Sequence, residues 1–81
     1  LSAVEPGAVF DLAIANIIAD VIIALCGQIV SVLRSQGKFI CSGIIREREA
    51  DVVAALEGAG FEVVEIRRRG EWVAICAQRV D

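Results

Sequence analysis

Four short groups of residues in this chain carry side chains that could do chemistry. The amide of Asn16 closes one apolar run, and the pair Ser42-Gly43 closes a second. Three arginines follow a third run at positions 67–69, and the only tryptophan, Trp72, opens a fourth. An amide both donates and accepts hydrogen bonds, and an indole has an apolar face that attracts cations. No single group identifies a function, so their placement in the fold must show whether they form a site.

The composition excludes several kinds of site. The chain has no His, so a Ser–His or Cys–His dyad and a His-containing zinc site cannot form within it. Cys26, Cys41 and Cys76 make no CxxC pair, and we expect buried thiols in a reducing compartment rather than disulfides or a metal site. No glycine-rich phosphate-binding motif is present.

The first half of the chain predicts a strand and a helix. Val9–Asn16 is short and almost continuously apolar, which favours a strand covered on both faces. From Ile18 the spacing becomes helical, and we expect the helix to end near 35–37. Its predicted apolar positions share a spacing of three and four: Ile18, Val21, Ile22, Leu25, Ile29 and Val32.

The second half predicts a strand, a helix and a hairpin. We expect a buried strand over Lys38–Gly43 and a helix from about Arg46 to Gly58. A partly wet strand at Phe61–Ile66, a turn at Arg67–Gly70 and a last strand at Glu71–Ala77 complete the pattern. The order β-α-β-α-β-β predicts an α/β fold with three parallel strands and a final antiparallel one.

This topology brings the four groups to one rim, where the carboxyl ends of the parallel strands meet. Open α/β sheets bind their ligands beyond these strand ends. Each group also has a purely structural interpretation. Asn16 can cap the following helix, and Ser42-Gly43 can be an ordinary loop. The arginines can form a solvated hairpin tip paired with Glu65 or Glu71. Trp72 can simply pack against the hairpin.

The high apolar content of the chain must be explained by its fold. The chain has 81 residues, of which 57% are hydrophobic, and a net charge of −3. Leu12–Leu33 lacks Lys and Arg, but Asp20 would lie near a bilayer centre, so we expect no membrane span. The mildly acidic charge disfavours nucleic-acid binding, and no signal peptide is visible, so we expect a cytoplasmic protein.

Both helices are predicted on one face of the sheet, which leaves the other face and the outer edge of the first strand bare. The chain also begins at Leu1 rather than at Met. We therefore expect 1–81 to be a single partial domain excised from a longer protein. The alternative is a non-catalytic α/β module, a homodimer that self-associates through its exposed sheet face.

Four segments resemble one enzyme family. Phe10–Asp20, Ser42–Ile45, Ala59–Glu65 and Gly70–Ala74 are similar to FDLVVANILAD, SGIL, AGFEVVE and GEWVA of the PrmA family. These bacterial S-adenosylmethionine-dependent methyltransferases modify large-subunit ribosomal protein eleven. The chain departs from the family pattern at Gly27, where a Pro is common, and before the second strand, where KPGG is common.

The resemblance implies the C-terminal half of a class I (Rossmann-like) methyltransferase fold, with seven strands in the order 3-2-1-4-5-7-6. It implies S-adenosylmethionine as cofactor, with the glycine-rich cofactor loop outside this chain, and a ribosomal protein as substrate. Asn16 would orient the acceptor lysine or N-terminal amine beside the cofactor, and Trp72 would wall the pocket. The fragment alone is expected to be inactive. The roles of Ser42 and the three arginines stay open.

Overall fold

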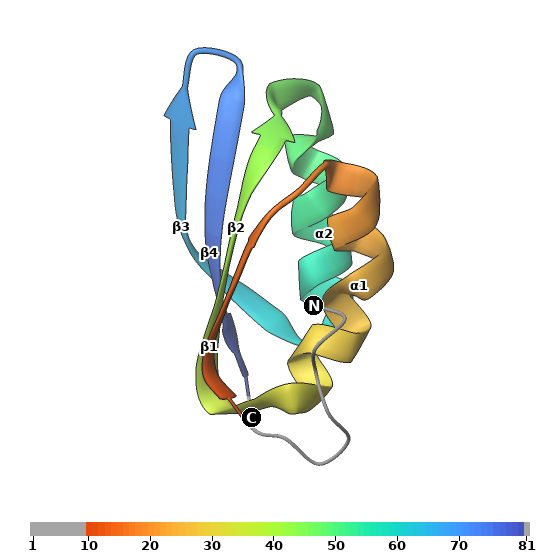
Figure 1. Cartoon of the computed structure of the whole chain (residues 1–81), viewed down its shortest axis with the longest axis vertical. Coiled ribbons are helices and arrows are strands. Elements are labelled where there is room, and N and C mark those ends of the chain that lie inside the picture. Colours follow the sequence, from red (N-terminus) through yellow and green to blue (C-terminus); the bar gives the residue numbers. More distant parts are fainter. Residues whose placement is uncertain (1–9, 81) are drawn as a thin grey trace.

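The computed structural model describes residues 10–80, which form one sheet with two helices (Figure 1). The elements are β1 (Phe10–Asn16), α1 (Ala19–Val32), β2 (Leu33–Ile45), the 3-10 turn η1 (Arg46–Arg48), α2 (Glu49–Ala59), β3 (Phe61–Arg69) and β4 (Trp72–Arg79). The element order is the predicted one. Val9, where the first strand was predicted to begin, and Leu1, on which the expectation of a longer protein was based, lie outside the described residues.

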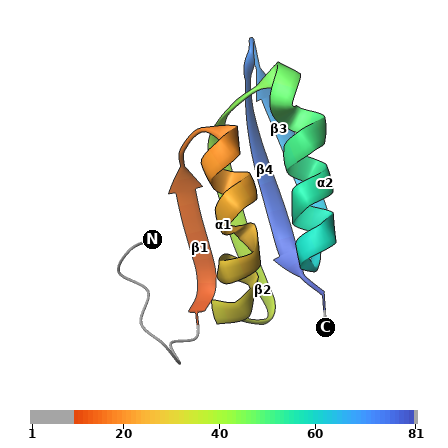
Figure 2. The same ribbon diagram turned by 90° about the vertical axis from the view of Figure 1, so that its right-hand side faces the viewer.

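The four strands form a mixed sheet in the order β1-β2-β4-β3. β1 pairs parallel with β2, and β4 pairs antiparallel with both of its neighbours. β1, β2 and β3 therefore point the same way. Both helices pack on one face of this sheet, side by side, as Figure 2 shows. The carboxyl ends of β1 and β2 and the β3–β4 hairpin tip consequently share one rim.

The core lies between the sheet and the two helices. Its largest fully buried side chains include Phe39, Leu56 and Ile75, from a strand, a helix and a second strand. α1 contributes a narrow stripe: Ala19, Ile22, Cys26 and Ile29. Two residues that we predicted on the apolar face, Ile18 and Val21, are 64% and 38% exposed. The helix begins at Ala19 after an extended Ile18, which turns the buried stripe away from both positions.

The predicted end of the first helix at 35–37 is wrong. The helix stops at Val32, and Leu33 is already extended, buried and paired with Phe10. The Arg79 guanidinium donates hydrogen bonds to the backbone oxygens of Val30 and Leu33, at 2.8 and 2.5 Å, and so adds a side-chain donor at the helix end, where Val30 also accepts the Leu33 backbone N–H. Within β2, the polar segment 34–37 interrupts the regular pairing with β1: the register shifts between Phe10 and Leu12, and Gln36 has a φ of 69°.

The predicted turn over Arg67–Gly70 is also wrong. β3 continues through Arg69, which pairs with Trp72, and the turn consists of Gly70 and Glu71 alone. Gly70 has a φ of 60°, as two-residue hairpin loops require. The arginines therefore lie along a strand and have defined neighbours across the ladder.

The sheet face opposite the helices carries exposed apolar side chains. Leu12 and Ile14 of β1 are 48% and 65% exposed. β1 is also the terminal strand of the sheet, so its outer edge has no strand partner among residues 10–80. No helix in the described part of the chain is long and apolar enough to cross a membrane.

Candidate functional site

The carboxyl ends of β1 and β2 form the centre of the rim. Asn16 pairs with Ser42 in the parallel ladder, and the backbone N–H of Ile17 donates to the Ser42 carbonyl at 3.2 Å. β2 bulges at Ser42 and Gly43: Cys41 pairs with Ile75 and Ile44 pairs with Val73. Two residues of β2 therefore lie opposite the single residue Ala74 of β4. This bulge aims the Ser42-Gly43 backbone at the Asn16 side chain.

Asn16 and Gly43 are in close contact. A Cβ on residue 43 would lie 2.6 Å from the Asn16 side-chain oxygen, and Gly43 has a φ of +81°. Asn16 does not cap α1, because the capping position is Ile18. Asn16 is exposed, and within residues 10–80 its amide makes no hydrogen bond. The Asn16 side-chain oxygen thus lies against Gly43, and the residue remains exposed.

Trp72 stands beside Gly43 on the same rim. It pairs with Ile45 of β2 on one side and Arg69 of β3 on the other, and it is 53% exposed. Two hollows share Gly43 and Trp72 as lining residues. The smaller, about 160 Å³, is lined by Ile18, Ala19, Asp20, Gly43, Ile45, Arg48 and Trp72. The larger, about 400 Å³, is lined by Ser42, Gly43, Arg67, Arg68, Arg69, Trp72, Val73 and Ala74.

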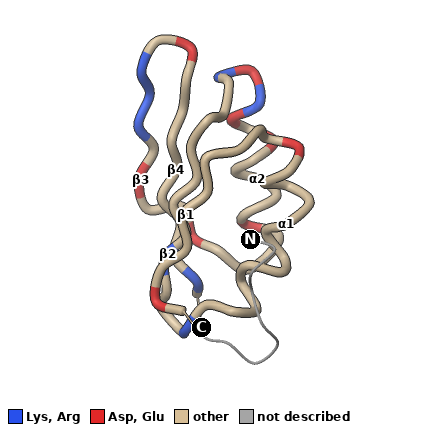
Figure 3. Tube along the Cα trace, in the orientation of Figure 1, with Lys and Arg blue, Asp and Glu red and all other residues tan. Residues whose placement is uncertain are grey.

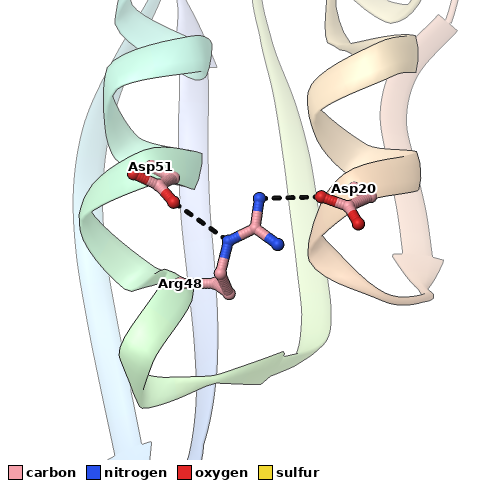
Figure 4. Close-up of polar contacts among 3 residues, drawn as sticks. All are labelled: Asp20, Arg48 and Asp51. Carbon is pink, nitrogen blue, oxygen red and sulfur yellow. Dashed lines mark hydrogen bonds and ion pairs between the residues drawn. The ribbon is translucent and has the colours of Figure 1, made fainter.

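An ion-pair clamp borders the smaller hollow. The Arg48 guanidinium contacts Asp20 at 2.7 Å and Asp51 at 2.9 Å (Figure 4). Asp20 lies in the first turn of α1 and Asp51 in the first turn of α2, so the clamp ties the two helix starts together. The sequence did not predict this clamp, because no local pattern links Asp20 of one helix to Arg48 before the other.

The three arginines have different surroundings. Arg68 makes a two-fold contact with Glu49 of α2, at 2.7 and 2.6 Å, and this hydrogen bonding lowers the pKa of the Glu49 carboxyl. Arg67 pairs with Glu65 at 2.5 Å, one of the two predicted partners. Arg69 makes no ion pair within residues 10–80. Figure 3 shows the basic stretch of β3 below an acidic hairpin tip.

The cysteines are free thiols. Cys26 and Cys41 are buried, as predicted, whereas Cys76 is only partly buried. Burial raises the pKa of the Cys41 thiol to about 11, so it stays protonated and unreactive at neutral pH. Within the described residues, no group of three His, Cys, Asp or Glu side chains could hold a metal ion.

The fold and rim define a class of protein. A crystal structure of ribosomal protein L11 methylase from Lactobacillus delbrueckii subsp. bulgaricus matches the whole chain with a TM-score of 0.90 and 31% identity, over 41% of its own length. A crystal structure of an M1.HpyAVI-SAM complex matches 90% of the chain at a TM-score of 0.75 and 12% identity, over 46% of its own length, so it shares the fold alone. The fold is therefore an α/β fold with a mixed sheet, of a kind found in a methylase.

The sequence gives the family. Residues 2–80 match the family described as Ribosomal protein L11 methyltransferase (PrmA), and the chain belongs to this family. The Ribosomal protein L11 methyltransferase of Agathobacter rectalis is 48% identical over 71 residues, which are 88% of this chain and 22% of the relative. The chain thus spans about a fifth of the length of the curated relatives that it matches. The expected resemblance is confirmed.

Proposed function

We propose that the chain is the C-terminal half of a class I (Rossmann-like) methyltransferase catalytic domain. The observation that carries this is the sheet order β1-β2-β4-β3, with β4 antiparallel to both neighbours. It fits strands four to seven of the order 3-2-1-4-5-7-6. The exposed apolar face of β1 and its open edge would then be covered by the rest of the same domain, in a longer cytoplasmic protein.

The longer protein would transfer methyl groups from S-adenosylmethionine to lysine or N-terminal amines of ribosomal protein L11. Family membership and the relatives' names support this substrate, and a solved SAM complex shares the fold. The glycine-rich loop that would hold the cofactor lies outside this chain. The chain alone should therefore neither bind S-adenosylmethionine appreciably nor transfer a methyl group.

Asn16 would orient the acceptor. A neutral amine must aim its nitrogen lone pair at the methyl carbon. One of its N–H groups can donate a hydrogen bond to a side-chain amide oxygen, which fixes that direction. The cofactor would supply the methyl group: its S–C bond would break as the new N–C bond forms, and a proton would leave the nitrogen for solvent. The open amide at the strand end, positioned by Gly43, has the properties that this task needs. Its place at the strand end also lets Asn16 contact the cofactor.

Trp72 would form the wall of the acceptor pocket. Its half-exposed indole lines both hollows at the rim, next to Gly43. An aromatic face there stabilises the positive charge of a sulfonium or of a methylated ammonium by cation–π attraction.

The test uses the full-length protein, ribosomal protein L11 and S-adenosylmethionine, with mass spectrometry of the product. We expect added methyl groups on lysine or N-terminal amines, and none when the 81-residue chain replaces the full-length protein. Methylation of another atom type, or of no site, would contradict the proposal. Micromolar binding of S-adenosylmethionine to the short chain in isothermal titration would contradict its assignment as the incomplete half.

A second candidate is a non-catalytic module that dimerises through its bare sheet face. The exposure of Leu12 and Ile14 on a terminal strand favours it. Light scattering after size exclusion separates the two candidates. A stable dimer of the full-length protein that buries this face, without methyl transfer, supports the module, and an active protein with this face buried inside one chain supports the enzyme.

A further inference from the structure

The larger hollow at the rim has its arginines on one side, the side formed by β3. Its outer wall is the end of β3, where alternate residues point to opposite faces of the sheet. Arg68 pairs with the buried Val73 and reaches α2 on the helix side. Arg67 and Arg69 pair with Ala74 and Trp72, so they share the helix-free face with the indole.

Among residues 10–80, Arg69 is the one of these three arginines that lacks a carboxylate partner. Arg68 is held by Glu49, and Arg67 is held by Glu65. Arg69 has no carboxylate partner within residues 10–80. In the described part of the chain, the hollow therefore offers one guanidinium without an ion pair, next to a half-exposed indole.

We infer that this hollow is a specificity subsite that binds a carboxylate side chain of the protein substrate, close in sequence to the amine that is methylated. Arg69 provides a planar donor pair that fits a carboxylate. Gly43 and Trp72 line this hollow, and Gly43 contacts Asn16, so the subsite lies beside the proposed acceptor position. The inference rests on the proposed function and adds a substrate preference to it.

The local charge favours a single carboxylate over a nucleic-acid backbone. A polyphosphate chain needs several free cations in a row. Here Glu65 already occupies Arg67, and Glu71 adds a further negative charge at the hairpin tip. Arg46 also lies at this hairpin tip, where its guanidinium approaches the Gly70 carbonyl oxygen at 3.5 Å. Two arginines without an ion pair among residues 10–80 are too few to follow a nucleic-acid backbone, and Arg69 is the one that lines the hollow.

The experiment measures binding of two peptides to the full-length protein by isothermal titration. Both peptides are N-acetylated and contain one lysine. In the Glu peptide this lysine has a Glu on each side, and in the Gln peptide both Glu residues are replaced by Gln. We expect the Glu peptide to bind about three- to fivefold more tightly, the range of a partly exposed ion pair. Arg69→Gln should abolish this preference. Arg34→Gln, which removes an exposed arginine far from the rim, should retain it.

Equal binding of the two peptides to the unmodified protein, or no binding of the Glu peptide, would overturn the inference. So would a preference that survives in Arg69→Gln. If Arg69→Gln instead weakens binding of an oligoribonucleotide and leaves the peptide preference intact, the hollow is an RNA contact and the inference is wrong. Methylation of ribosomal protein L11 is assayed in parallel, so that loss of the proposed function is seen separately from loss of the peptide preference.

Discussion

The side-chain oxygen of Asn16 fills the space that a Cβ on residue 43 would need, 2.6 Å from that position. The close approach is possible because Gly43 has no side chain and adopts a φ of +81°, where other residues are strained. Two strand ends far apart in sequence thus define one amide position. In our account this contact aims the amide at the acceptor amine.

Replacing Gly43 with Ala tests whether this contact matters. We expect Gly43→Ala to lower the free energy of unfolding by about 1–3 kcal/mol, the cost of a left-handed non-glycine residue. Displacement of Asn16 should lower kcat more than the stability loss explains. The measurements are thermal unfolding and methyl transfer by the full-length protein.

The matched control is Gly58→Ala in α2, where a Cβ meets open space. A glycine-to-alanine change inside a helix should stabilise the protein by about 0.5–1 kcal/mol and leave kcat unchanged. If both variants behave alike, the close contact at Gly43 has no special role.

Trp72→Ala should raise the KM for ribosomal protein L11 about tenfold, because the indole face and its cation–π attraction are lost. Trp72→Phe should retain most of the affinity. The indole is 53% exposed, so the free energy of unfolding should fall by only about 1 kcal/mol. Steady-state kinetics of the two variants check this. A similar rise in KM for Phe10→Ala, at the other end of the sheet, would remove Trp72 from the pocket.

The contact between Glu49 and Arg68 predicts a pH dependence of stability. Arg68 lowers the pKa of Glu49 below the ordinary value of 4.5, so the folded state prefers the carboxylate. This stabilisation is present above the unfolded-state pKa and is lost as the pH falls through the lowered folded-state pKa. Glu49→Gln should therefore be less stable than the parent at neutral pH, with a difference that vanishes in acid.

Thermal unfolding across a pH series measures this difference. Glu57→Gln is the control, since Glu57 is exposed on the same helix and makes no ion pair within residues 10–80. A constant difference between Glu49→Gln and the parent at all pH values would show that the contact with Arg68 is not the cause.

The element order was predictable because each segment has its own periodicity. The strand–helix switch after Asn16 and the αL cap at Gly60 are local signals. The ends of the helices and strands were not predictable, because tertiary contacts determine them. The helix stops before Leu33 because that side chain is buried in the sheet, and Arg79, distant in sequence, satisfies the helix end.

The rim was predictable in outline and its details were not. Topology alone places Asn16, Ser42 and Trp72 at one edge, where the structure finds them. The Arg48 clamp and the separate surroundings of the three arginines depend on side chains from different elements. Such contacts between distant segments leave no local pattern in the sequence, so one sequence alone does not predict them.

We propose above all that Asn16 positions the acceptor amine. Steady-state methylation of ribosomal protein L11 by full-length Asn16→Ala tests it most directly. We expect kcat/KM to fall at least about a hundredfold, as lost orientation does, with thermal stability unchanged because the amide is exposed and makes no hydrogen bond within residues 10–80. Gln28→Ala, an exposed amide on α1, should retain full activity. Equal activity of Asn16→Ala and the parent protein would contradict the account.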